Sequence, residues 1–290
     1  MREYKTLGNI IYKTVIYLFM LLVLIVCLVP FLYIISVSLS DPVAVVNGEV
    51  FIHPVGFSLE AFEQIFAYPN FFRAYGNTIF YTIAGTLISL IMMTLFAYPL
   101  SKTFLKGQKI VMKFVIFSMF FSGGMIPNYL LISSPHMVNT RFAILIPFAI
   151  NQFNLILLIN FFKSIPNDIE EAAIIDGLSY TGVLLKIVLP LSGAGIATIS
   201  LYTAVFFWND WFNSLIYLKS SQYPVMLYLR NIVNGTTQIA GSSGTSSDTA
   251  SLSMSIKCAV ILVSTLPIIM VYPFLQKYFV KGVMVGSVKG

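Results

Sequence analysis

Long apolar stretches separated by short polar segments dominate this chain. Six of them contain about 20 or more mostly apolar residues, the length that a helix needs to cross the hydrocarbon core of a bilayer. They lie at roughly 14–38, 75–100, 111–133, 142–162, 188–217 and 257–277. The pattern predicts an all-α, polytopic membrane protein with six transmembrane helices. No soluble domain is evident at either end, so we expect residues 1–290 to form a single membrane domain.

Composition supports a lipid environment. Hydrophobic residues make up 58% of the chain and charged residues 10%, whereas about a quarter of the residues in soluble domains are charged. A soluble protein of this size would not bury so much apolar surface. The net charge of +6 therefore does not require a nucleic acid partner, and the lipid bilayer is the expected partner.

The distribution of basic residues predicts the orientation in the membrane. One set of loops holds most of the lysines and arginines: Arg2, Lys5, Lys13, Lys102, Lys106, Lys109, Lys113, Lys163, Lys186, Lys277, Lys281 and Lys289. Lysine and arginine concentrate in cytoplasmic loops. We therefore expect a membrane protein with both termini in the cytoplasm. The first apolar stretch is too long for the core of a signal peptide, so we interpret it as a retained helix.

No enzyme motif is present in the sequence. His53 and His136 are the only histidines, and both lie in predicted outer loops. A phosphate-binding loop ending in Gly-Lys-Ser/Thr is absent, and the segment 122–127, with two glycines and a proline, is better interpreted as a helix break. Cys27 and Cys258 are expected to be buried thiols. We predict no catalytic site, metal or directly bound cofactor.

The loop at 163–187 is longer than a connector between two spans requires. Pro166 predicts a turn, and Asn167 or Asp168 is a candidate N-cap. Glu170 and Glu171 are expected in the first turn, where the helix dipole favours negative charge. Ala172 and Ala173 would allow close approach by a partner. Gly177 can end the helix in a left-handed conformation, before a second short helix that contains Tyr180.

This loop therefore predicts a two-helix elbow that contacts something outside the bilayer. The residues that we expect to contact a partner are Glu170, Glu171, Ala172, Ala173, Asp176 and Gly177. An ordinary connector is the alternative, and Glu170 could equally be a solvated partner of a nearby lysine.

Polar side chains inside the spans indicate a second candidate site, because such residues are costly in a membrane. Aromatic faces beside hydrogen-bonding groups suit the C–H faces and hydroxyls of sugars. The candidates are Trp208, Asn209, Asp210 and Asn213, with Asn128 and Tyr129; Trp211, Asn151, Gln152 and Asn154 extend the set. An interfacial aromatic belt and interhelical hydrogen bonds are the alternatives.

A family resemblance follows from the loop motif. Glu171-Ala172-Ala173, Gly177, and Ile187 with Leu189-Pro190 match the signature loop of bacterial binding-protein-dependent ABC importer permeases without a gap. Asp176 and the segment 208–212 resemble the maltose-type, carbohydrate-importing branch. The segment 121–127 resembles a subgroup that imports complex oligosaccharides. The resemblance covers essentially the whole chain.

The resemblance implies a permease that forms half of a carbohydrate pathway and couples it to ATP hydrolysis. Its implied partners are a second homologous permease, two ATP-binding subunits that carry ATP and Mg, and an extracellular sugar-binding protein. It implies that the loop at 163–187 docks on an ATPase. The C-terminal tail is either a second contact with the ATPase or a solvated basic tail, and the outer loop at 234–253 is either a contact with the binding protein or an unstructured linker. The alternatives are an importer for another polar solute and an ion-coupled secondary transporter.

Overall fold

The computed structural model describes residues 7–67, 70–233, 254–271 and 273. Residue contacts divide the chain into two compact units: one comprises Met1–Pro69 and Asn231–Leu266, and the other comprises Asn70–Arg230 and Pro267–Gly290. Each unit is described by itself. The prediction that 1–290 is a single membrane domain stays a prediction. The expected contacts at 234–253 and in the C-terminal tail lie outside the described residues.

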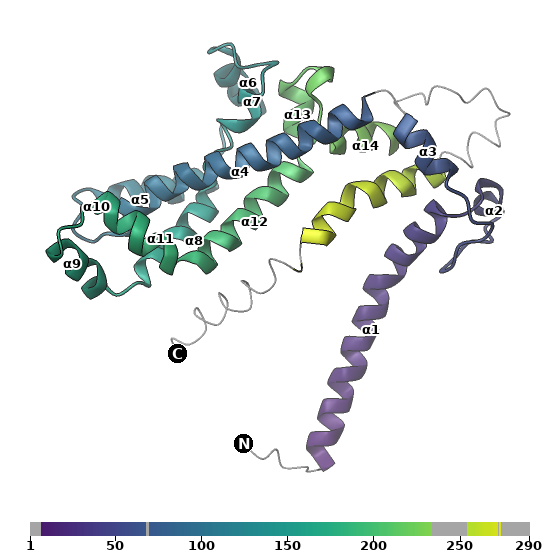
Figure 1. Cartoon of the computed structure of the whole chain (residues 1–290), viewed down its shortest axis with the longest axis horizontal. Coiled ribbons are helices and arrows are strands. Elements are labelled where there is room, and N and C mark those ends of the chain that lie inside the picture. The colour runs from purple at the N-terminus through teal and green to yellow at the C-terminus, as the bar shows by residue number, and fades with distance from the viewer. Residues whose placement is uncertain (1–6, 68–69, 234–253, 272, 274–290) are drawn as a thin grey trace. The chain divides into compact units, whose positions relative to one another are not determined.

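The N-terminal part of the first unit contains one long helix followed by two short ones. They are α1 (Leu7–Ser38), α2 (Pro42–Val46) and α3 (Glu60–Ala67) (Figure 1). Apolar side chains along α1 are exposed on every side, as expected for a helix surrounded by lipid. Cys27 lies on this exposed surface, so the expectation that it is a buried thiol is wrong. Cys258 is buried as expected.

The second unit is a bundle of helices. Those before the loop are α4 (Phe71–Ser101), α5 (Gln108–Phe120), α6 (Met125–Ser133), α7 (Phe142–Leu145) and α8 (Gln152–Lys163). The loop itself forms α9 (Asn167–Ile175) and α10 (Tyr180–Val183), then a π-helical turn (Leu184–Val188) and α11 (Leu189–Leu191). The last helices are α12 (Gly193–Asn209), α13 (Phe212–Tyr217), a 3₁₀ turn (Ser220–Gln222) and α14 (Val225–Val233).

The described residues confirm an all-α membrane protein. Some of the predicted spans are single continuous helices, and others are interrupted. Three helices are long and apolar enough to cross a bilayer: Ile10–Ser38, Phe71–Ser101 and Met254–Val271. The predicted spans 111–133 and 188–217 are broken instead. The span 142–162 consists of α7 and the 12-residue α8, whose length of about 18 Å is shorter than the hydrocarbon core.

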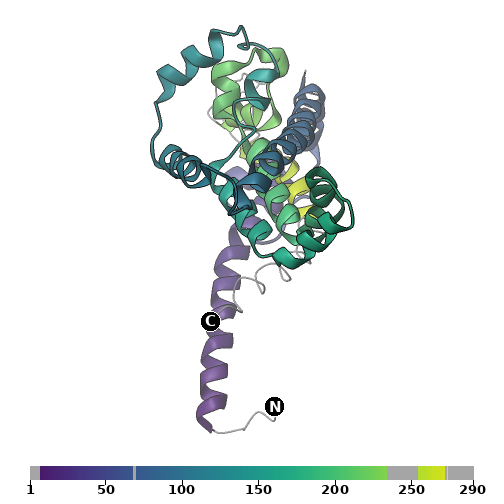
Figure 2. The ribbon, with the colours of Figure 1, turned by 90° about the vertical axis from the view of Figure 1, so that its left-hand side faces the viewer.

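The first of the two breaks occurs at a glycine with a positive φ, and the second lies between Leu191 and Gly193. The axes of α5 and α6 differ by 116°, and Gly124 between them has a φ of +90°, which a residue with a side chain rarely adopts. The helix break that the sequence predicts is therefore confirmed (Figure 2). The second bend, of 81°, follows Leu191, so the straight part of the fifth span begins at Gly193 and not near 188.

Three helices form the centre of this unit. α4 packs along α12 and α8, and α8 also packs against α12 (Figures 1 and 2). Two glycines bring the helices close together. A Cβ atom added to Gly85 on α4 would lie 2.5 Å from the ring of Phe207 on α12, and one added to Gly195 would lie 2.5 Å from the ring of Phe161 on α8.

We predict that Gly85→Ala destabilises the protein by about 2 kcal/mol, because the fully buried ring of Phe207 leaves no room for a methyl group. Gly76→Ala is the matched control, since Gly76 lies on the same helix with nothing within 4 Å of the added carbon. Thermal unfolding of the purified protein in detergent measures both. Equal melting temperatures for the two variants would contradict this packing.

Candidate transport pathway and coupling loop

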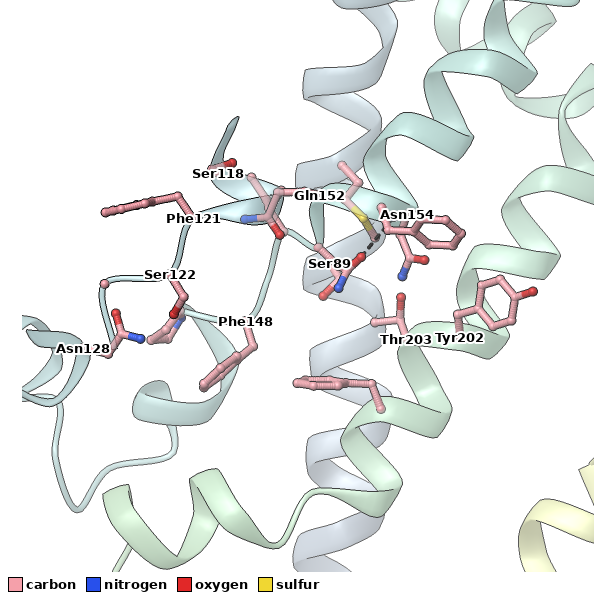
Figure 3. Close-up of a pocket in the computed structure, with 17 residues that line it drawn as sticks. Ser89, Ser118, Phe121, Ser122, Asn128, Phe148, Gln152, Asn154, Tyr202 and Thr203 are labelled. Atoms are coloured by element: carbon pink, nitrogen blue, oxygen red, sulfur yellow. Dashed lines mark hydrogen bonds between the residues drawn. The ribbon is translucent and has the colours of Figure 1, made fainter. Parts of the chain in front are cut away.

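A cavity of about 750 Å³ opens in the second unit between α4, α8, α12 and the break after α5. We call it the main cavity. Its polar lining comes from hydroxyl and amide side chains: Ser89, Ser118, Ser122, Asn128, Asn151, Gln152, Asn154, Tyr202 and Thr203 (Figure 3). None of the described residues that line it is charged. Its volume lies within the range of about 300–1,000 Å³ that is typical of ligand pockets.

Two hydroxyl groups in the main cavity have no hydrogen-bond partner among the described residues. Ser89 is 1% exposed and Thr203 is 5% exposed, and the hydroxyl oxygen of each is buried and unpaired. An unsatisfied buried hydroxyl costs free energy. These two positions on α4 and α12 are therefore suited to contact a polar ligand.

A second cavity, of about 410 Å³, shares Ser122, Asn128, Pro147 and Phe148 with the main cavity. We call it the adjoining cavity. Gly124 and Met125 at the start of α6 also line it, as does Asn213 on α13. The broken span therefore exposes irregular backbone to a cavity, which is where such backbone is tolerated at membrane depth.

The sequence-predicted pathway residues are not all brought together. Asn128 lines both cavities and Asn213 lines the adjoining one. Tyr129 stacks on Tyr217, with ring centroids 6.1 Å apart. Trp208 is buried with its ring 5.9 Å from that of Tyr75, and the exposed Asn209 lines neither cavity.

The carboxylate of Asp210 accepts hydrogen bonds from residues that follow it closely in the sequence. It accepts hydrogen bonds from the Nδ2 of Asn213 at 2.8 Å and from the Oγ of Ser214 at 2.8 Å. It also accepts hydrogen bonds from the backbone N–H groups of Asn213 and Ser214, at 3.3 and 3.1 Å. These bonds cap the start of α13. The geometry assigns Asp210 to holding α13, which positions Asn213 beside the adjoining cavity.

The loop at 163–187 contains the two short helices expected from its sequence, α9 and α10. The expected start of α9 is wrong, because Pro166 occupies the N-cap position and no side chain caps the helix. Asp168 and Glu170 lie in the first turn, so the placement of Glu171 there is also wrong. Glu171, Ala172 and Asp176 are exposed, whereas Glu170 and Ala173 are buried.

Glu170 is 6% exposed and forms a buried ion pair with the Nζ of Lys102, the residue that follows α4. Tyr98, one turn earlier, donates its hydroxyl to the Oε2 of Glu170 at 3.4 Å. The Lys102 Nζ lies 4.8 Å from the centre of the Tyr98 ring. Glu170 therefore lies on the side of α9 that faces its own chain. The alternative of a lysine partner for Glu170 is confirmed, but the pair is buried and not solvated.

The two helix dipoles favour this ion pair. Lys102 places a positive charge at the C-terminus of α4, and Glu170 places a negative charge in the first turn of α9. Both are the favourable signs for those helix ends. Because the side chains of Lys102 and Glu170 are only 10% and 8% exposed, the loss of one charge would leave the other largely buried and uncompensated.

Gly177 ends α9 in the manner that its sequence predicts. Its φ is +89°. The N–H of Gly177 donates to the carbonyl of Ile174 at 3.0 Å, and the N–H of Leu178 donates to that of Ala173 at 3.0 Å. This pair of bonds is a Schellman motif, which satisfies carbonyls that a helix end leaves free. The turn leads directly into α10, whose N-cap is Ser179.

Comparison with known proteins identifies the family. Residues 104–285 match the family described as "Binding-protein-dependent transport system inner membrane component". The chain belongs to this family. Protein LplC of Bacillus subtilis (strain 168) is 44% identical to this permease over 266 residues, which cover 91% of this chain and 90% of the relative.

Two further relatives cover nearly the whole permease. The polygalacturonan/rhamnogalacturonan transport system permease protein YtcP of Bacillus subtilis (strain 168) is 41% identical over 286 residues, 98% of this chain and 100% of the relative. A solved structure is similar with a TM-score of 0.85 and 33% identity, covering 95% of this chain and 99% of the other. It is described as a bacterial ABC transporter involved in the import of the acidic polysaccharide alginate.

Sequence reasoning missed four polar residues of this permease. Lys102 and Tyr98 partner a glutamate that lies 68 and 72 positions later, and Ser89 and Thr203 are single hydroxyls in apolar helices. A lysine at the end of a predicted span was the available signal for the ion pair. No local pattern distinguishes the two hydroxyls from those that bond to their own helix.

We predict that Lys102→Met destabilises the permease by about 3–5 kcal/mol, because it leaves the Glu170 carboxylate buried without a partner. Lys102→Met combined with Glu170→Gln should recover much of that loss, since no uncompensated charge remains. Lys106→Met, at an exposed position, is the control. Thermal unfolding of the purified permease compares the four proteins, and a double variant no more stable than the single one would contradict the assignment.

Proposed function

We propose that this chain is the membrane-spanning permease subunit of an ATP-driven carbohydrate importer in the bacterial cell membrane, with an oligosaccharide as its substrate. The observation that carries the proposal is the uncharged cavity of hydroxyl and amide groups beside the broken span. Alcohols and amides exchange hydrogen bonds with sugar hydroxyls in both directions. The names of two relatives support the proposal, since one states transport of polygalacturonan and the other import of alginate.

The coupling loop would join this pathway to ATP hydrolysis on partner subunits. One face of α9 is fixed to α4 by Glu170, and the opposite face, which contains Ala172 and Ile175, is exposed among the described residues. Ile175 on this face is 85% exposed, and Ile169 and Ile174 on the flanks of the helix are 43% and 40% exposed. Burial of Ile175 by a partner subunit would be favourable, and the exposed Ala172 leaves room for close approach.

The remaining subunits follow from the same proposal. A second, homologous permease would supply the other half of the pathway, and a binding protein outside the cell would deliver the sugar. Two ATPase subunits would carry ATP and Mg, so that no catalytic group is needed in this chain. ATP binding would favour the conformation open to the outside, and hydrolysis the one open to the inside, because each state binds its ligands differently.

The orientation is part of the proposal. The ion pair and the packing of α8, α9 and α10 against α4 place Lys102, Lys163 and Lys186 around one end of the second unit. An accumulation of lysines favours the cytoplasmic side. Both termini would then be cytoplasmic.

An ion-coupled secondary transporter is less well supported. Such a mechanism uses a titratable group inside the membrane that is free to bind and release an ion. Asp210 was the carboxylate available for this role, and its oxygens accept four hydrogen bonds that hold α13.

We predict that Ile175→Asp impairs docking of the ATPase subunits. Burying one isoleucine contributes about 2 kcal/mol, so that its loss weakens association by roughly thirtyfold. Because Ile175 is exposed in this chain, the permease itself should fold normally. The test is ATP-dependent uptake of an oligosaccharide by the complete importer in proteoliposomes, together with co-purification of the ATPase.

Lys219→Gln, an exposed substitution at the opposite end, serves as the control and should leave both properties unchanged. Normal uptake by the Ile175 variant would refute the docking face. The failure of the unmodified importer to take up any carbohydrate while it transports another polar solute would refute the substrate class.

A further inference from the structure

The N-terminus of α6 opens into the adjoining cavity without a cap. No side chain of the described residues bonds to its first turn, and Pro127 in that turn has no N–H. The N–H of Gly124 is taken by the Oγ of Ser122 at 3.3 Å. The next two N–H groups, of Met125 and Ile126, have no acceptor among the described residues.

These free N–H groups lie at the break of a candidate membrane span. Backbone donors left unpaired in the hydrocarbon region are costly, so they must be satisfied by protein, by water or by a ligand. The N-terminus of a helix also carries a partial positive charge. Among the residues that the structure describes, no aspartate or glutamate lines either cavity, so a negatively charged ligand would meet this helix end without repulsion from those side chains.

The main cavity supplies an independent sign of a ligand. The residues Ser89 and Thr203 are more than nine-tenths buried and line the main cavity, and their hydroxyl groups have no partner within the described part of the chain. Ser122 and Asn128 belong to the walls of both cavities, which makes the two cavities adjacent. Figure 3 shows Ser122 and Asn128 on one side of the main cavity, with Ser89 and Thr203 across from them.

We propose that the two cavities together form a binding site for an acidic oligosaccharide, one that contains uronic acid. A carboxylate of the sugar binds the free N–H groups at the start of α6, and hydroxyls of the same or the next sugar ring bond to Ser89 and Thr203. This proposal rests on the carbohydrate-importer function and specifies its substrate class. It makes the helix break between α5 and α6 the element that selects negative charge.

The test uses the importer of both permeases and the ATPase subunits in lipid nanodiscs, without the binding protein. Equilibrium binding of trigalacturonate is compared with binding of the same trisaccharide after its carboxyl groups are reduced to alcohols. The proposal predicts tighter binding of the acidic form. Asn128→Asp adds a negative charge beside the helix end and should weaken binding of the acidic form by roughly tenfold or more, with little effect on the reduced form.

Asn139→Asp is the matched control for added charge. Asn139 is exposed, lines neither cavity and has a φ of +63°, which aspartate also tolerates. It should bind both sugars as the unmodified importer does.

Thr203→Val separates a ligand-binding role from a structural one. Removal of an unpaired buried hydroxyl leaves the ligand-free protein equally stable or more stable. The same change should weaken binding of both trisaccharides by about fivefold, because each loses one hydrogen bond. A merely structural hydroxyl would leave sugar binding unchanged.

The outcomes distinguish the substrate class from the wider function. Equal binding of the acidic and reduced trisaccharides would overturn the acidic site while leaving a carbohydrate importer in place. Binding of neither, alongside uptake of a neutral glycan by the complete importer, would also overturn the acidic site alone. If no glycan of either kind binds or is transported, the proposed function fails together with this inference.

Discussion

The buried ion pair between Lys102 and Glu170 is the constraint on which the geometry of the coupling loop depends. Two opposite charges removed from water must remain together, because separating them leaves each uncompensated. The pair joins the end of α4 to the first turn of α9, and so it determines which side of α9 faces its own chain. Glu171, Ala172 and Ile175 are then left on the free surface. Without this ion pair, α9 would not present a fixed face to a partner subunit.

α4 is the element that links this constraint to the cavity. Ser89 and Met93 on this helix line the main cavity, and Tyr98 and the following Lys102 contact Glu170. The distance along the helix from Ser89 to Lys102 is about 20 Å. Since Gly85 also brings α4 against α12, a displacement of α9 reaches two walls of the cavity through packed helices and not through a flexible loop.

Much of this arrangement follows from sequence patterns that act locally. Apolar runs locate the spans, the glycines and proline at 122–127 locate the helix break, and Gly177 marks the end of α9 through its left-handed backbone. The sequence places the spans at 111–133 and 188–217, but it reveals neither the bend after Leu191 nor the angle at either break, because hydropathy does not record the direction of a helix. The predicted N-cap of α9 is wrong by one or two positions, because the helix begins directly after Pro166 and has no side-chain cap.

The residues that sequence patterns do not reveal are those whose partners lie far away in the chain. Glu170 is an acidic residue in a polar loop, and only its contact with Lys102 shows that it is buried. Asp210 follows a tryptophan and an asparagine that suit sugar binding, yet its oxygens hold α13. Ser89 and Thr203 differ from the other small polar residues of the spans only because three helices place them around one cavity.

The most direct test of this account is a distance measured between spin labels at Asn167 on α9 and Lys106 after α4, in the complete importer after replacement of Cys27 and Cys258. Both labelled positions are exposed. If the ion pair makes α9 and the end of α4 move together, the distance distribution remains the same without nucleotide and with ATP bound. A distribution that shifts or broadens when ATP binds would show that α9 moves independently of α4, and would contradict the central role given to Lys102 and Glu170.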